Sequence, residues 1–146
     1  MCNSSALRDL DKVILHCSAT IEGAHIDVDT IRTWHKARGW NDIGYHYVIY
    51  RDGSVHQGRG VDKIGAHTAS QNKTSIGVCY VGGISAKTGK PADTMTAEQE
   101  MGWLELWHSL NVCFGKLELY GHNDFARKAC PCFDVKEKYK FLIEEK

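Results

Sequence analysis

Short apolar runs bounded by glycine and polar residues recur along this chain, and each has the length of one β-strand. The first run reads KVILHC, and later runs are rich in valine, isoleucine and tyrosine. Between two of them, Asp52-Gly53 is typical of a two-residue hairpin turn. The pattern predicts five strands, at residues 12–17, 45–51, 54–58, 75–81 and 117–120.

Three longer segments carry apolar residues three or four positions apart, which is the period of a helix with one buried face. They predict helices at residues 27–38, 97–110 and 135–144. Each begins beside a capping residue: Asp27 or Asp29 in the first, Thr96 paired with Gln99 in the second, and Asp134 in the third. The residues expected to face inward are Ile31, Trp34 and Ala37 in the first helix, and Tyr139, Leu142 and Ile143 in the last.

Strands and helices alternate along the chain without a linker, a repeat or a low-complexity tract. The expected fold class is α+β (mixed α/β): one domain over residues 1–146, with its core at about 12–144. We expect a central mixed sheet of about five strands flanked by about three helices. In such sheets, functional side chains gather at the ends of strands.

Charge and composition exclude several classes of function. The 146 residues carry 18 basic and 18 acidic side chains, and no basic run occurs, so we expect no nucleic-acid partner. The apolar runs are too short to cross a bilayer, so no membrane partner is expected either. The first residues lack the features of a signal peptide, which predicts a protein that is cytoplasmic as synthesised. We expect a monomer.

Six cysteines are present, but the chain is neither tiny nor evidently exported, so a disulfide framework is not expected. Cys17, Cys79 and Cys113 stand in apolar stretches and are interpreted as buried reduced thiols.

His16 lies at the carboxyl end of the first predicted strand, His122 comes just after the last, and Cys130 lies eight residues further on. Imidazole nitrogen and thiolate sulfur are ligands that zinc prefers, and three protein ligands leave a fourth position open for chemistry. The trio therefore predicts one catalytic zinc ion. Taken alone, His16 at the end of a buried strand would more often be a hydrogen-bonded core histidine.

Four stretches carry a family resemblance: ILHCSAT, IRTWHKARGWNDIGYHYVIYRDG, GAHTASQNKTSIGVCYVGGI and GHNDFARKACPCFD. In this order they resemble the zinc-dependent N-acetylmuramoyl-L-alanine amidases, a family that includes amidase-type phage lysozymes and peptidoglycan-recognition proteins. The resemblance places zinc on His16, His122 and Cys130, and active-site roles on Tyr45 and Lys128. It implies peptidoglycan or muropeptides as substrate, cut between N-acetylmuramic acid and the L-alanine of the stem peptide.

A long sugar-peptide substrate needs an open groove, for which His35, Trp40, His67 and Asn72 are the candidate contacts. Alternatives stay open at several of these positions. His67 is as consistent with capping of its own loop, Lys128 with a solvated surface lysine, and Tyr45 with a core tyrosine. Cys132 departs from the family pattern, since a second thiol beside Cys130 can compete for the metal or be oxidised with it.

The function expected from this resemblance is a zinc-dependent amidase of phage or prophage origin, that is, an endolysin. Without an export signal, such an enzyme reaches the wall only through a separate pore or after the cell breaks. The alternatives are a non-catalytic peptidoglycan-recognition module of the same fold and a cytoplasmic amidase that recycles muropeptides.

Overall fold

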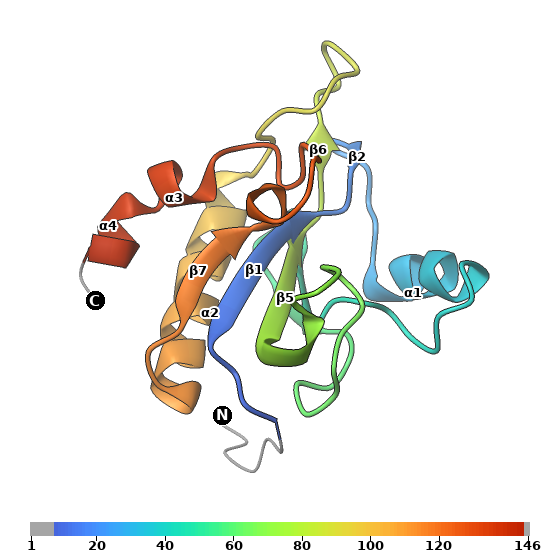
Figure 1. Cartoon of the computed structure of the whole chain (residues 1–146). Coiled ribbons are helices and arrows are strands. Elements are labelled where there is room, and N and C mark those ends of the chain that lie inside the picture. The colour runs from blue at the N-terminus through green and yellow to red at the C-terminus, as the bar shows by residue number, and fades with distance from the viewer. Residues whose placement is uncertain (1–7, 145–146) are drawn as a thin grey trace.

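The computed structural model describes residues 8–144, so both ends of the predicted domain (1–7 and 145–146) lie outside the described residues. Its centre is a mixed sheet of five strands in the order β4-β3-β5-β1-β7 (Figure 1). β1 is parallel to both of its neighbours, β3 is parallel to β5, and β3 is antiparallel to β4. The five strands are β1 (Lys12–Cys17), β3 (Tyr47–Ile49), β4 (Val55–Gln57), β5 (Ser75–Tyr80) and β7 (Glu118–Gly121). The predicted α+β architecture is confirmed.

The helices are α1 (Val28–Ala37), α2 (Ala97–Phe114), α3 (Val135–Lys138) and α4 (Lys140–Glu144). The predicted last helix is thus divided in two at Tyr139. Tyr139 leaves the helical conformation, its ring is buried, and its hydroxyl donates a hydrogen bond of 3.0 Å to Glu100. Burial of this one aromatic side chain against α2 interrupts a segment whose apolar period is otherwise continuous.

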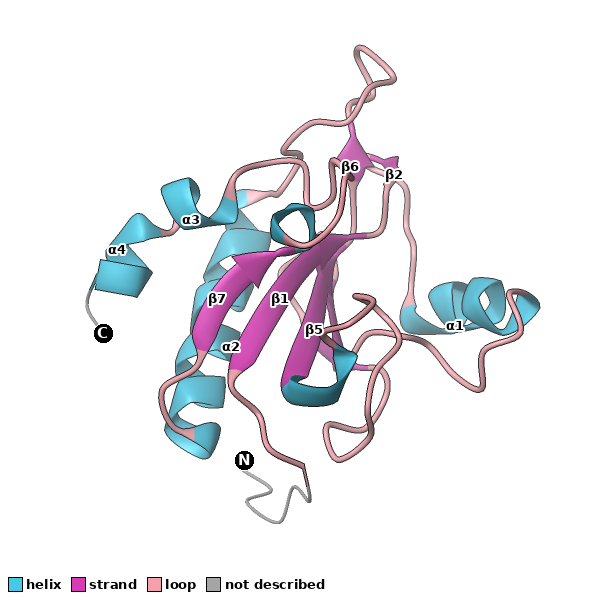
Figure 2. Cartoon of the chain, in the orientation of Figure 1, coloured by secondary structure: helices cyan, strands magenta, loops and turns pink. Residues whose placement is uncertain are grey.

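Four shorter elements were not predicted. They are the two-stranded pair β2 (Thr20–Ile21) and β6 (Gly83–Ile84), and the 3₁₀ turns η1 (Asn72–Thr74) and η2 (His122–Asp124). Elements of two or three residues are too short to show a periodic pattern. Figure 2 shows η2 among loops at the end of the sheet where β1 and β7 stop.

Alternation along β1 separates the core from the candidate site. Val13, Leu15 and Cys17 belong to the main apolar core, which also contains residues of α2 on one face of the sheet (Figure 1). Successive side chains of a strand point to opposite faces, so Ile14 and His16 point away from α2. Their partners on β5 are Gly77 and Cys79, which leaves His16 fully buried on the opposite face.

The buried face of α1 differs from the prediction. Val28, Ile31 and His35 are buried, whereas Ala37 is exposed and Trp34 keeps 42% of its surface accessible. The expected inward orientation of Trp34 and Ala37 was therefore wrong. In so short a helix the spacing of apolar residues is compatible with two neighbouring buried faces. Packing against the rest of the protein decides which of the two is buried.

The helix caps agree with the sequence. Thr96 Oγ1 accepts the backbone N–H of Gln99, and the Gln99 side chain accepts the N–H of Thr96, both at 2.9 Å. Asp27, not Asp29, caps α1 by accepting the N–H of Thr30 at 2.8 Å. These local bonds satisfy N–H groups that the first turn of a helix leaves unpaired.

Two of the three predicted buried thiols are confirmed, because Cys17 and Cys79 are buried and free. Cys113 is half-buried near the end of α2 and is disulfide-bonded, so its prediction as a reduced thiol was wrong. Within residues 8–144, no helix is long and apolar enough to cross a bilayer.

Candidate metal centre

His16, His122 and Cys130 meet at one edge of the sheet. One ligand atom from each lies within 4.8 Å of the other two. The Nδ1 atom of His16 is 3.7 Å from Cys130 Sγ, and the rings of the two histidines have centroids 4.7 Å apart. Tetrahedral zinc with ordinary bond lengths separates nitrogen and sulfur ligands by about 3.5 Å. The trio therefore has the spacing and the donor set to hold a metal ion.

Parallel pairing explains why two of these side chains converge. β1 and β7 are neighbouring parallel strands, with Leu15 opposite Gly121. Their carboxyl ends lie at the same edge, so His16 and His122, the next residues in each strand direction, become neighbours although they are far apart in sequence.

Cys130 reaches the same edge from a loop that is held in place at two points. The buried hydroxyl of Tyr80 donates to the carbonyl of Pro131 at 2.7 Å, and Asn123 Nδ2 donates to the carbonyl of Phe133 at 3.0 Å. The backbone N–H of Cys17 donates to Cys130 Sγ at 3.2 Å. A hydrogen bond of this kind favours a sulfur that carries negative charge, as a thiolate ligand does.

Burial keeps both histidines of the trio neutral. It lowers the pKa of His16 well below its ordinary value, with further contributions from the neighbouring His67, His122 and Lys128. Burial and the charge of Lys128 also lower the pKa of His122. Only the neutral ring has a nitrogen lone pair that can bind a metal, so these pKa shifts favour metal binding over protonation.

Lys128 is exposed, but its charge acts on both histidines. An ammonium group on a flexible stem can approach a negatively charged oxygen formed beside the trio.

Tyr45 lies beside His16, with ring centroids 5.1 Å apart. Part of the residue is accessible at the surface, but burial of its hydroxyl raises the pKa of Tyr45 well above its ordinary value. The phenol is therefore protonated at neutral pH and acts as a donor.

His67 is buried behind His16, with its Nδ1 atom 2.9 Å from His16 Nε2. The side-chain oxygen of Asn72 accepts the backbone N–H groups of His67 and Thr68 at 2.9 and 2.8 Å, and so fixes the loop. Both residues thus have supporting bonds of their own. Their contact with a substrate stays a prediction.

His35 and Trp40 continue the series of ring contacts that begins with His16 and Tyr45. The His35 ring contacts Trp40 at 4.7 Å and Tyr45 at 5.4 Å between centroids. His35 is buried, and its Nδ1 accepts the backbone N–H of Gly44 at 2.8 Å, whereas Trp40 is half-buried. Of these two predicted substrate contacts, Trp40 is the more accessible.

The second thiol of the loop is directed elsewhere. Cys132 Sγ lies 3.6 Å from Cys17 Sγ and 3.3 Å from the carbonyl oxygen of Gly83. Among the described residues, the trio that can share a metal contains Cys130 and not Cys132.

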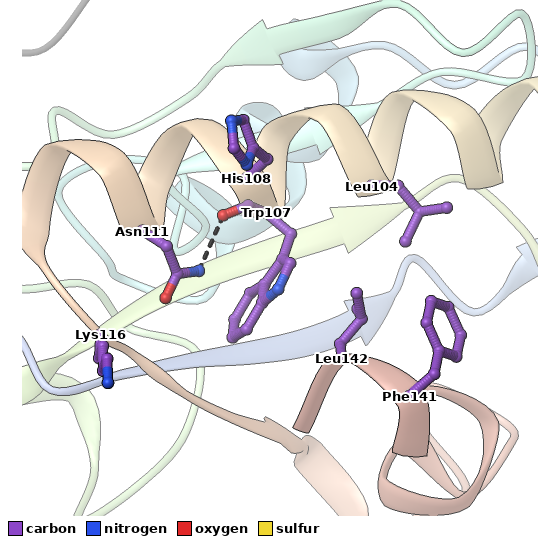
Figure 3. Close-up of a pocket in the computed structure, with 7 residues that line it drawn as sticks. All are labelled: Leu104, Trp107, His108, Asn111, Lys116, Phe141 and Leu142. Carbon is purple, nitrogen blue, oxygen red and sulfur yellow. Dashed lines mark hydrogen bonds between the residues drawn. The ribbon is translucent and has the colours of Figure 1, made fainter. Parts of the chain in front are cut away.

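A hollow of about 420 Å³ lies elsewhere, between α2 and α4 (Figure 3). Asn111, one of its lining residues, donates to the backbone carbonyl of Trp107 at 2.8 Å. Its lining residues are Leu104, Trp107, His108, Asn111, Lys116, Phe141 and Leu142. None of them belongs to the trio or its neighbours, so this hollow is separate from the candidate metal centre.

Comparison with known proteins agrees with this geometry. The sequence pattern of the family described as N-acetylmuramoyl-L-alanine amidase matches residues 6–133. The chain is similar to the endolysin of Enterobacteria phage K11, at 42% identity over 91% of this chain and 87% of that protein. It is also 44% identical to the endolysin of Klebsiella phage KP32, over 88% of this chain and 85% of that protein.

The fold is shared with a solved structure, the N-acetylmuramoyl-L-alanine amidase LysC from Clostridium intestinale URNW. The TM-score is 0.76 at 23% identity, over 91% of this chain and 87% of the other. The match of the family pattern to most of the chain, together with the identity to phage endolysins, establishes the relationship. The chain belongs to the N-acetylmuramoyl-L-alanine amidase family.

Proposed function

We propose that this protein is a zinc-dependent endolysin that hydrolyses the amide bond between N-acetylmuramic acid and L-alanine in peptidoglycan. The observation that carries the proposal is the convergence of His16, His122 and Cys130, one sulfur and two imidazole rings, in a chain of the amidase family. The solved amidase and the phage endolysins it resembles bear names that fit this activity.

The trio fits zinc better than a hard cation such as magnesium, which prefers oxygen ligands. His16, His122 and Cys130 would hold the ion and leave one coordination position open. A bound zinc ion supplies Lewis acidity, which makes water a better nucleophile at neutral pH and polarises the scissile carbonyl.

The neighbouring side chains supply the remaining groups. Lys128 approaches the oxygen on which negative charge develops, because its ammonium already acts on both histidines. Tyr45 is protonated at neutral pH, so it orients the attacking water or the carbonyl by donating a hydrogen bond. A role for Tyr45 as the base comes second, since removing its proton is costly in this buried position.

The test uses purified peptidoglycan and asks which bond is cut. Amide hydrolysis releases the amino group of L-alanine without new reducing sugar ends, and each product is measured separately. We expect amino groups to appear with the wild type, to vanish in a strong chelator, and to return on addition of zinc. Cleavage that persists in the chelator and in Cys130→Ser would refute the zinc mechanism.

The same assay separates the alternatives. Peptidoglycan-recognition proteins are more distant relatives, and a protein of that kind without activity would bind wall fragments but release no amino groups. A recycling amidase would prefer soluble anhydro-muropeptides to intact wall. We expect the intact wall to be the better substrate, as for an endolysin.

A further inference from the structure

His67 touches the candidate metal centre from behind. Its Nδ1 atom lies 2.9 Å from the Nε2 atom of His16, and both rings are buried. The opposite nitrogen of His16, Nδ1, is the one that faces Cys130 Sγ. For His16 to bind a metal through Nδ1, that nitrogen must be unprotonated. The proton of the neutral ring must then be on Nε2.

The direction of the hydrogen bonds around His67 can be followed from a fixed end. Ser75 Oγ donates its only proton to the backbone carbonyl of Gln71, at 2.7 Å. Its oxygen, 3.3 Å from His67 Nε2, must then accept from that nitrogen. With the proton on Nε2, the Nδ1 atom of neutral His67 is an acceptor. His16 Nε2 must therefore be the donor, and its Nδ1 is bare.

Thr68 is a rival partner that leads to the same result. Its Oγ1 lies 3.0 Å from His67 Nδ1 and 3.2 Å from His16 Nε2. The hydroxyl has one proton, and if it donates that proton to His67 Nδ1, its oxygen can still accept from His16 Nε2. In either arrangement His16 Nε2 carries a hydrogen, but only one of them makes His67 the direct acceptor.

Two glycines fix the position of the His67 ring. A Cβ atom on Gly77 would lie 2.6 Å from His67 Cγ and Cδ2, and one on Gly65 would lie 2.8 Å from Cδ2. Both separations are shorter than carbon atoms tolerate, so the ring rests directly on backbone. Together with Asn72, which holds the N–H of His67, these contacts leave the ring little freedom to turn away from His16.

We propose that His67 is a positioning residue for the metal centre: it accepts a hydrogen bond from His16 Nε2 and so holds the Nδ1 lone pair of His16 toward the metal. This inference rests on the proposed function, because it assigns His67 a purpose only if the trio binds zinc. It replaces direct contact with substrate as the interpretation of His67, which is almost fully buried.

The first test needs no metal. Long-range ¹H–¹⁵N spectra of the metal-free protein at neutral pH distinguish the two tautomers of each neutral histidine ring. We expect both His16 and His67 to carry their proton on Nε2. A His16 ring protonated on Nδ1 would overturn the proposal, whatever the protein does with zinc.

The second test measures zinc affinity by competition with a chromophoric chelator. In His67→Asn the amide oxygen replaces the Nδ1 acceptor, whereas His67→Leu fills the space without an acceptor. We expect His67→Leu to weaken zinc binding by about 10- to 100-fold, the usual effect of removing a partner of a metal-bound histidine, and His67→Asn to recover most of it. The His16 signals of His67→Leu should also show a mixture of tautomers.

Thr68→Val is the matched control, since it removes the rival hydroxyl and keeps the shape. A large loss in Thr68→Val with little loss in His67→Leu would transfer the role to Thr68 and overturn the proposal. Equal affinity in the wild type and in His67→Leu would do the same. If the wild type itself binds no zinc, the proposed function fails, while the tautomers of the metal-free protein still decide the direction of the hydrogen bond.

Discussion

We expect two histidines outside the candidate metal centre to make the stability of the fold depend on pH. Burial lowers the pKa of His46 from 6.5 to about 4, and burial with the charges of Arg38 and Arg59 does the same for His35. In both rings Nδ1 accepts a backbone N–H, from Gly77 at 3.0 Å and from Gly44 at 2.8 Å. A proton on Nδ1 would place the N–H of the ring directly against the N–H of the backbone, so that two donors face each other.

The direction of the pH effect on stability follows from these pKa values. Above pH 6.5 the ring is neutral in both the folded and the unfolded chain, so it adds no pH dependence. As pH falls below 6.5, the unfolded chain binds a proton on the ring that the folded chain does not bind. The free energy of unfolding therefore falls until the pH reaches the pKa of the ring in the folded chain. From pH 7 to pH 5 each histidine costs about 2 kcal/mol of unfolding free energy.

The assay is urea unfolding of the metal-free protein at both pH values, followed by circular dichroism at constant ionic strength. His46→Asn keeps an acceptor near Gly77 but does not titrate. We expect its loss of unfolding free energy between pH 7 and pH 5 to be about 2 kcal/mol smaller than that of the wild type. The matched control His108→Asn, at an exposed position of α2, should behave as the wild type does. Equal losses in His46→Asn and the wild type would refute the reasoning.

Three further predictions concern catalysis, packing and a helix cap. Lys128→Ala should lower kcat by about 10²- to 10³-fold with zinc content unchanged, measured by amino-group release and metal analysis; loss of the metal would contradict a role at the developing oxyanion. Gly77→Ala should lower the unfolding free energy by about 1–3 kcal/mol, because its Cβ would overlap the His67 ring, and a neutral effect in thermal unfolding would disprove that contact. Thr96→Ala should cost about 1 kcal/mol in urea unfolding through loss of the α2 cap, whereas an unchanged midpoint would show that the cap contributes nothing.

Local patterns predicted the longer elements and, through them, two members of the candidate trio. The apolar run of β1 placed His16 at the end of a strand, and the run of β7 placed His122 directly after one. Parallel pairing of these strands does the rest, since it brings both ends to one edge. The prediction that Cys130 joins them depended on the family resemblance, because the sequence of a loop alone does not show which part of the sheet the loop approaches.

What could not be predicted depends on contacts between distant segments. The bond between His16 and His67 joins residues 51 positions apart, and no spacing rule encodes it. The exposure of Trp34 was missed because the period of α1 fits two faces. The break at Tyr139 arises from packing against α2, which the sequence of the last helix does not contain.

The most direct test of the central claim is X-ray absorption at the zinc K-edge of the purified protein. A trio of His16, His122 and Cys130 predicts one sulfur at about 2.3 Å and nitrogen or oxygen neighbours at about 2.0–2.1 Å. The sulfur signal should disappear in Cys130→Ser and persist in Cys132→Ser. A wild-type spectrum without sulfur, or a signal that disappears only in Cys132→Ser, would contradict the metal centre described above.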